Sequence, residues 1–315
     1  MAQKLAVVNN KGGSTKTTSV VNLAGAIHVM APKARILLFE GDGQGNAGRS
    51  FKVNSNKIED TVYDVFIGNK SVKDVILHDV YEGIDLLPAN SDMNFFEFDK
   101  MKDYEETFTK TTYDLIKELA NRKVDFDSLG FDEWQKLLPS TVSMTDNYFN
   151  LLKGKIDEIE DEYDFILFDT PPEVKSVTSS ILAIADQVII PFEPDVYSVD
   201  GIINILERID IIKNDYNPKL NIAGLLPVKV NPRTNLHSQV QAQVFRFASL
   251  HNIPFFGTFI PMTIKFATST AHQGLPATLA TTKAAKTDKM IQSYFDLLNE
   301  MISKDIIDLE VVNNG

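Results

Sequence analysis

Two lysines, two glycines and three threonines are concentrated in residues 11–18, directly after a short apolar run. The segment reads Lys4-Leu-Ala-Val-Val-Asn-Asn-Lys-Gly-Gly-Ser-Thr-Lys-Thr-Thr18. Glycines permit a tight turn whose backbone N–H groups converge, and a helix that begins at the turn adds the positive end of its dipole. Ammonium and hydroxyl groups at such a turn suit phosphate oxygens and a magnesium ion. The segment therefore predicts a loop that binds the phosphates of a nucleotide.

This loop departs from the ordinary pattern G-x-x-x-x-G-K-[ST], because Asn10 and Thr15 stand where that pattern has glycines. It matches K-G-G-x-x-K-[ST], in which Lys11 is an additional cation. Lys16 is expected to reach the β- and γ-phosphates, and the Thr17 hydroxyl is expected to bind Mg²⁺. A glycine turn with surface lysines is the simpler alternative, and the strand–loop–helix context argues against it. The predicted nucleotide contacts in the loop are Lys11, Gly12, Gly13, Ser14, Thr15, Lys16, Thr17 and Thr18.

Carboxylates follow two further apolar runs. Residues 36–39 lead to Glu40 and Asp42, and residues 165–168 lead to Asp169. The carboxyl ends of parallel strands meet at one edge of a sheet, where ligands of open α/β folds bind. A carboxylate beside a phosphate loop is well placed to serve a magnesium ion or an attacking water. Both strand ends are therefore candidates for the chemical part of the site.

Short apolar runs alternate with helical patterns along the chain. Each run is nearly continuously apolar, which is typical of parallel strands covered on both faces. The predicted strands are residues 4–8, 35–40, 84–88, 165–169, 187–191, 221–228 and 255–260. The predicted helices are residues 16–30, 177–185, 200–212, 236–250 and 287–302. This order predicts an α/β fold with a doubly wound, mostly parallel sheet in a single domain over residues 1–315.

Residues 98–150 interrupt this alternation, because they contain no run typical of a parallel strand. Helical patterns cover residues 107–122 and 132–138, and the segment holds the only tryptophan, Trp134. Its aromatic residues favour a helical insertion over a linker. A structural embellishment without a function of its own is the alternative, and the pattern does not decide between them.

Composition and charge narrow the classes of partner. The chain has no cysteine, which excludes disulfides, thiolate zinc sites and cysteine-bound iron–sulfur clusters. No signal peptide and no membrane-spanning run is apparent, so we expect a soluble, cytoplasmic protein. The net charge is −12, yet residues 201–290 hold ten Lys or Arg against four acids, a net charge of +6. That segment can present a basic face to a polyanion, although chance clustering on a solvated surface explains it equally well.

With these motifs in order, the sequence resembles the ParA/MinD group of P-loop ATPases with a deviant Walker A loop, and within it the ParA/Soj DNA-partitioning branch. The resemblance covers most of the chain apart from residues 98–150. Glu40-Gly-Asp-Gly-Gln-Gly-Asn46 is similar to the family motif D-x-D-P-Q-G-N, with Glu40 and Gly43 as departures. Asp169-Thr-Pro-Pro172 is similar to the Walker B aspartate and the switch loop after it. Further similar segments are residues 188–201, 228–235 and 260–276, the last with Met262 where the family has arginine.

The resemblance implies an ATPase that converts ATP and water to ADP and phosphate, with weak basal turnover. It implies catalytic roles for Lys11, Lys16 and Asp42, with Asp42 orienting the attacking water. Thr17, Asp42 and Asp169 would form the magnesium side, and Asn231 and Pro261 the base side of the nucleotide. Lys11 resembles the signature lysine that reaches the nucleotide of the other subunit, so ATP would hold a homodimer together and hydrolysis would release it.

The same branch implies binding to DNA without sequence preference, a ParB-like centromere-binding partner that stimulates hydrolysis, and association with the nucleoid. The basic segment is where we expect DNA contacts, because such binding uses Lys and Arg against phosphates. The candidate DNA-binding residues are Lys213, Lys219, Arg233, Arg246, Lys265, Lys283 and Lys286. The partner, the cargo, the formation of filaments and the effect of the changes at Glu40 and Gly43 stay open.

A MinD-like membrane-associated positioning ATPase is the main alternative. That class ends in a basic amphipathic helix, whereas residues 303–315 of this chain are acidic, which anionic lipid would repel. We therefore expect no membrane partner. Relatives that carry an iron–sulfur cluster need cysteines, and related tyrosine kinases end in a tyrosine cluster, whereas the last tyrosine here is Tyr294. A small-molecule synthetase of the same fold is a further alternative.

Overall fold

A central sheet organises the computed structural model, which describes residues 1–13, 15–125, 130–137, 148–172, 175–280 and 287–309. The predicted site residues Ser14, Lys283 and Lys286 lie outside the described residues. The strands are β1 (Gln3–Val7), β2 (Ile36–Glu40), β3 (Leu77–Tyr81), β4 (Ile84–Leu87), β5 (Phe165–Asp169), β6 (Gln187–Phe192) and β7 (Asn221–Pro227). Their order is β3-β4-β2-β5-β1-β6-β7, and every neighbouring pair is parallel except β3 and β4. The predicted doubly wound, mostly parallel sheet is confirmed.

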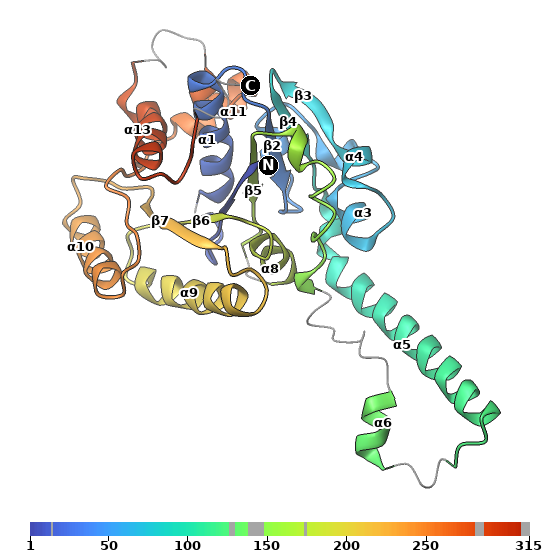
Figure 1. Cartoon of the computed structure of the whole chain (residues 1–315). Coiled ribbons are helices and arrows are strands. Elements are labelled where there is room, and N and C mark those ends of the chain that lie inside the picture. Colours follow the sequence, from blue (N-terminus) through green and yellow to red (C-terminus); the bar gives the residue numbers. More distant parts are fainter. Residues whose placement is uncertain (14, 126–129, 138–147, 173–174, 281–286, 310–315) are drawn as a thin grey trace.

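Helices cover both faces of this sheet (Figure 1). The longer ones are α1 (Lys16–Met30), α5 (Phe96–Asn121), α9 (Ser198–Asp215), α10 (Asn235–Leu250), α11 (Lys265–Gln273) and α13 (Lys289–Ser303). The shorter ones are α2 (Asn46–Arg49), α3 (Val62–Ile67), α4 (Val72–Val75), α6 (Phe131–Leu137), α8 (Ser176–Leu182), η1 (Ser55–Lys57), η2 (Ser91–Asn94), η4 (Glu160–Glu162) and η5 (Ala277–Leu279). One buried apolar cluster joins the sheet to α1, α11 and α13, and a second joins it to α3, α4, α8, α9 and α10.

The predicted strand at residues 255–260 is wrong, because only one isolated bridge forms there, between Leu225 and Phe255. A second isolated bridge joins Val230 to Pro261, directly after this segment. Two backbone N–H groups of the segment are used elsewhere. Those of Gly257 and Thr258 each donate to the Glu300 carboxylate at 2.8 Å. A carboxylate from the last helix thus replaces part of the ladder that an apolar run would otherwise form.

Strand β3 was not predicted, because its residues are partly polar rather than continuously apolar, and none of them is fully buried. It pairs antiparallel with β4 across a tight turn at Gly83, whose φ is +70°. A left-handed φ of this kind favours glycine. Short polar strands of this type protect the edge of a sheet, where apolar patterning gives little signal.

Helix α5 leaves the body of the molecule and projects away from it (Figure 1). The pattern predicted helix only at residues 107–122, whereas α5 begins at Phe96 and continues to Asn121. Of its side chains only Phe96 and Leu119 are buried. Phe96 fixes the base of α5 on the body. Because the rest of α5 projects from the body, we refer to this helix as the arm.

In the part of the chain that the structure describes, no helix is long and apolar enough to cross a membrane.

Candidate nucleotide site

The loop between β1 and α1 has the backbone conformation that a phosphate loop needs. Gly13 and Thr15 both have left-handed φ values, of 71° and 63°. Thr15 directly precedes α1, so the turn leads into the first helical turn, whose free N–H groups can bind an anion. A β-branched residue is strained in this conformation, and the buried Thr15 hydroxyl finds no hydrogen-bond partner within the described chain. Strain and an unsatisfied polar group at one residue mark this turn as a ligand site.

Asn9 orders the loop, and the sequence analysis did not single it out. Its side-chain amide donates to the carbonyl of Pro191, and its Oδ1 accepts the N–H of Lys11 at 2.7 Å. Its carbonyl accepts from Lys16 Nζ at 3.1 Å. Lys16 is buried, and burial lowers its pKa while the charges of Asp169 and Asp42 oppose that change. The lysine ammonium is therefore held in a dry position at the centre of the site.

Asp169 ends the central strand β5, between Val7 of β1 and Glu40 of β2. It is fully buried, and neither carboxylate oxygen has a hydrogen-bond partner among the described residues. Burial raises the pKa of Asp169 to about 8. The nearby Thr17 hydroxyl and the Lys16 charge oppose this rise, whereas Glu40 and Asp42 add to it.

A buried acid without donors is costly unless a ligand supplies positive charge. Oxygen donors are the ligands that Mg²⁺ prefers, so Asp169 and the Thr17 hydroxyl fit this ion. Two hydrogen bonds to backbone carbonyls fix the strand end that carries Asp169. The Thr170 hydroxyl donates to the Val7 carbonyl at 2.7 Å, and the Gly41 N–H donates to the Asp169 carbonyl at 2.8 Å.

Glu40 has a different role, because its oxygens already accept hydrogen bonds from the protein. Oε1 accepts the N–H groups of Ala47 at 2.6 Å and Gly48 at 3.2 Å, and Oε2 accepts those of Ala89 at 3.2 Å and the Ser55 hydroxyl at 3.4 Å. Burial raises the pKa of Glu40 to about 7, and the three N–H groups limit that rise. The carboxylate thus holds the start of α2 in place, and this arrangement does not support a magnesium-side role for Glu40.

Asp42 lies half-buried in the turn after β2, where its Oδ1 accepts the Gln44 N–H at 3.0 Å. The next residue, Gly43, stands where the family motif D-x-D-P-Q-G-N has proline, and the structure shows why a glycine fits this position. A Cβ on Gly43 would lie 2.8 Å from the carbonyl oxygen of Asn90 and 3.0 Å from Met93 Cβ. The chain ahead of the arm approaches so closely that only glycine fits this position without a shift.

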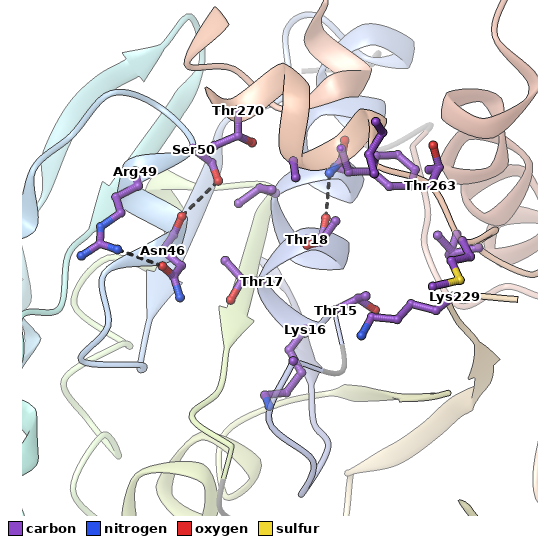
Figure 2. Close-up of a pocket in the computed structure, with 18 of the residues that line it drawn as sticks. Thr15, Lys16, Thr17, Thr18, Asn46, Arg49, Ser50, Lys229, Thr263 and Thr270 are labelled. Carbon is purple, nitrogen blue, oxygen red and sulfur yellow. Dashed lines mark hydrogen bonds between the residues drawn. The ribbon is translucent and has the colours of Figure 1, made fainter. Parts of the chain in front are cut away.

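A cleft of about 1040 Å³ opens in front of the loop. Figure 2 shows Thr15–Thr18 between Asn46, Arg49 and Ser50 on one side and Lys229 and Thr263 on the other. The predicted residues that line this cleft are Gly12, Gly13, Thr15, Lys16, Thr17, Thr18, Asp42 and Pro261. The sequence analysis missed several lining residues, among them Asn46, Arg49, Lys229, Thr263 and Ile264. All of these except Arg49 lie in segments that resemble the family, but no pattern in the sequence assigns these side chains to the site, and only the fold brings them to the cleft.

Asn231 does not line the cleft. Its Oδ1 accepts the Arg233 N–H at 3.1 Å, and its own N–H donates to His237 Nδ1 at 3.1 Å. These bonds order the turn before α10. Lys11 also lies outside the lining, with half of its side chain exposed, and its ammonium pairs with Asp195 and lies 3.7 Å from Glu193 Oε2. The hydrogen bond to Asp195 raises the pKa of Lys11. The lysine therefore stays charged at the mouth of the cleft and points toward the segment after β6.

The five candidate DNA-binding residues that the structure describes fall into two groups near opposite ends of β7. Lys219 precedes this strand, and Lys213 Nζ lies 3.5 Å from Asn221 Oδ1 at its first residue. Phe247, the neighbour of Arg246, lines the same surface hollow as Lys213. Arg233 and Lys265 follow the carboxyl end of β7, and Lys265 pairs with Asp288. The two groups therefore belong to different parts of the surface.

Comparisons with known proteins bear on the family and the fold of the chain. The chain matches the family model described as AAA domain over residues 2–138 and 133–222. It is 32% identical over 320 residues to a ParA family protein of Mycoplasma pneumoniae, across 99% of this chain and 98% of that protein. It is 25% identical over 301 residues to the chromosome partitioning protein ParA of Myxococcus xanthus, across 96% of this chain and 88% of that protein. A solved structure, the cobyrinic acid a,c-diamide synthase of Mycobacterium smegmatis with bound ATP analogue and magnesium, has a similar fold, with a TM-score of 0.68 and 22% identity over 96% of each chain.

Proposed function

The chain belongs to the ParA family of P-loop ATPases, and from this premise we propose that it partitions DNA as an ATP-dependent switch. ATP with Mg²⁺ joins two copies, the dimer binds DNA without sequence preference, and hydrolysis separates the copies. A ParB-like partner stimulates this hydrolysis, and the cargo is a plasmid or a chromosome. Residues 1–315 act as one ATPase domain, and residues 98–150 form a helical insertion in it.

The main support for this function is the fully buried carboxylate of Asp169 beside Lys16 and Thr17, for which the described residues supply no hydrogen bond of ordinary geometry. When bound, Mg²⁺ neutralises negative charge on the phosphates. Asp169, Asp42 and the Thr17 hydroxyl hold this ion, while Lys16 and the loop N–H groups bind the phosphate oxygens. Asp42, at the rim of the same cleft, orients the attacking water.

The position of Lys11 supports a dimer. Its ammonium lies outside the lining of the cleft in its own chain and pairs with Asp195, and the next two residues, Val196 and Tyr197, are 68% and 75% exposed. Exposed apolar residues that directly follow the partner of a fixed cation suit an interaction surface. A second copy that covers this surface brings its own Lys11 to the facing nucleotide, which makes the completed site depend on ATP.

DNA binding rests on the charge distribution and on the relative from Myxococcus xanthus, which is a chromosome partitioning protein. The segment of residues 201–290 carries +6 in a chain of −12, so the rest of the protein repels nucleic acid while this segment attracts it. A dimer doubles the number of cations that face one duplex. Because each neutralised phosphate releases counterions, binding should weaken steeply with salt.

The test is retention of linear DNA by the purified protein with ATP, with ADP and without nucleotide, each across a salt series. We expect retention with ATP only, with the logarithm of the binding constant falling linearly with the logarithm of salt concentration. Lys16→Ala should retain no more DNA with ATP than with ADP, because the buried ammonium is lost from the site. Lys33→Ala, an exposed lysine away from the cleft, is the matched control.

Equal retention by the wild type with ATP and with ADP would contradict the switch. Retention by Lys16→Ala at the wild-type level with ATP would contradict the role of Lys16. Sedimentation with anionic liposomes under the same conditions tests the MinD-like alternative. Binding to liposomes with ATP, without retention of DNA, would favour that alternative over DNA partitioning.

A further inference from the structure

The base of the arm is joined to the strand ends that carry the acids. Phe96 is buried, and its ring centroid lies 5.0 Å from that of Phe66 in α3. Phe66 contacts Phe39 at 6.2 Å, and Phe39 contacts Phe168 at 5.2 Å. Phe39 directly precedes Glu40, and Phe168 directly precedes Asp169. Close-packed aromatic rings transmit displacement with little loss, so the base of the arm is fixed relative to the nucleotide site.

Hydrogen bonds strengthen this attachment. Tyr63 of α3 donates its hydroxyl to Asp99 Oδ2 in the first turn of the arm at 2.7 Å. Two residues nearer the start of the arm, Glu97 Oε1 accepts the Ser176 hydroxyl at 2.5 Å. Ser176 is the first residue of α8 and follows Asp169 by seven positions. The second bond therefore joins the arm to the chain segment that leads away from the magnesium-side acid.

A second cavity of about 330 Å³ lies between the arm and the nucleotide cleft. Glu97 and Ser176 line one part of it, and Asp42 and Pro172 line another. Asp42 and Pro172 also line the nucleotide cleft, so the two cavities share a wall. Gly43, next to Asp42, packs on the Asn90 carbonyl just ahead of the arm. The turn with Asp42 and the start of α8 thus both contact the base of the arm or the residues just ahead of it.

We propose that Glu97 is a positioning residue for ATP hydrolysis, which acts by holding Ser176 and the segment after Asp169 in place opposite Asp42. This inference rests on the proposed ATPase function. Glu97 lines no part of the nucleotide cleft, so its loss leaves nucleotide binding intact and misplaces only the groups that act on the γ-phosphate and water. The base of the arm is then a point at which hydrolysis can be controlled from outside the nucleotide cleft.

The experiment measures kcat and KM for ATP in the full chain, normalised to the amount of nucleotide that each preparation binds. Glu97→Ala and Ser176→Ala should each lower kcat about five-fold and leave KM within about two-fold, as expected for a lost charge-assisted hydrogen bond that acts only in the chemical step. Glu97→Gln should keep most of the activity, because its amide oxygen can still accept the Ser176 hydroxyl. Glu106→Ala, an exposed glutamate further along the same helix, is the control for lost charge.

The double variant separates a shared contact from two independent effects. If Glu97 acts through Ser176, Glu97→Ala with Ser176→Ala should be no slower than either single variant. Additive losses, or a kcat of Glu97→Ala equal to or above that of Glu106→Ala, would overturn the inference. Ser176→Ala removes one hydroxyl only, so it decides the question if Glu97→Ala folds poorly. Absence of hydrolysis in the wild type would instead refute the proposed function.

Discussion

Three carboxylates lie at two neighbouring strand ends: Glu40 and Asp169 end β2 and β5, and Asp42 follows β2 by two residues. Their hydrogen bonds show that they have different roles. Glu40 accepts four protein donors and is structural. Asp169 accepts none among the described residues and is available to a cation. Asp42 is half-buried at the rim, where water and nucleotide can meet it. Residue type alone does not separate these roles, because all three are acids in one short motif region.

Glu40 should make stability depend on pH. Its pKa in the folded chain is about 7, above the ordinary value of 4.5, so the folded state binds its proton more tightly than the unfolded state does. The stability that Glu40 contributes is therefore fully present below its pKa in the unfolded chain, 4.5, and is lost as pH rises through its pKa in the folded chain, about 7. Between pH 5 and 8 it should amount to about 3 kcal/mol at most, by the relation of one pKa unit to free energy.

Urea unfolding of the wild type and of Glu40→Gln at several pH values measures this effect. The variant should be less stable at pH 5, because its amide NH₂ must face some of the donors that Glu40 accepts. Its disadvantage should shrink as pH rises, since only the wild type loses stability through this group. A difference that stays constant from pH 5 to 8 would refute the raised pKa. Glu106→Gln, at an exposed position, should show no such trend.

Secondary-structure elements bring these residues together through the order β2-β5-β1, whose carboxyl ends meet at the phosphate loop. The apolar runs predicted these strands, because each is covered on both faces by helices. Patterning failed at residues 255–260, where the Glu300 carboxylate from α13 takes two N–H groups, a contact distant in sequence. It also failed for β3, a polar edge strand.

Gly43 is the point where two elements meet most closely, and Gly43→Ala tests that contact. The added Cβ would lie 2.8 Å from a backbone oxygen, so the turn with Asp42 or the start of η2 must move. We expect a loss of about 1–3 kcal/mol in the free energy of unfolding, in the range of other overpacking changes. ATP hydrolysis should fall as well, because Asp42 moves with the turn.

The matched control for this change is Gly201→Ala in α9, where nothing lies within 4 Å of the added Cβ. It should be neutral or stabilise the chain by up to about 1 kcal/mol, because alanine is the better helix former. Urea denaturation and steady-state hydrolysis of both variants give the comparison. Equal stability of Gly43→Ala and Gly201→Ala would show that the close approach at Gly43 costs nothing.

In the whole molecule, the nucleotide cleft lies at the carboxyl ends of the parallel strands, and the base of the arm lines a second cavity that shares Asp42 and Pro172 with this cleft. The sequence predicted the strand, turn and helix around the phosphate loop and the strand ends that lead to Asp42 and Asp169, since each has a local pattern. It did not predict the contact of Glu97 with Ser176, which joins residues 79 positions apart. Nor did it separate the candidate DNA-binding residues into two groups, because net charge along a sequence carries no information on which surface each cation occupies.

The mass of Asp42→Ala in solution, measured by light scattering with ATP and Mg²⁺ and with ADP and Mg²⁺, shows whether ATP holds two copies together. We expect a dimer with ATP, since this variant binds the nucleotide and does not hydrolyse it, and a monomer with ADP. Adding Lys11→Ala to the same variant should leave a monomer in both states, because the cation that reaches across the interface is gone. The same mass with ATP and with ADP, or normal hydrolysis by Asp42→Ala, would contradict the account.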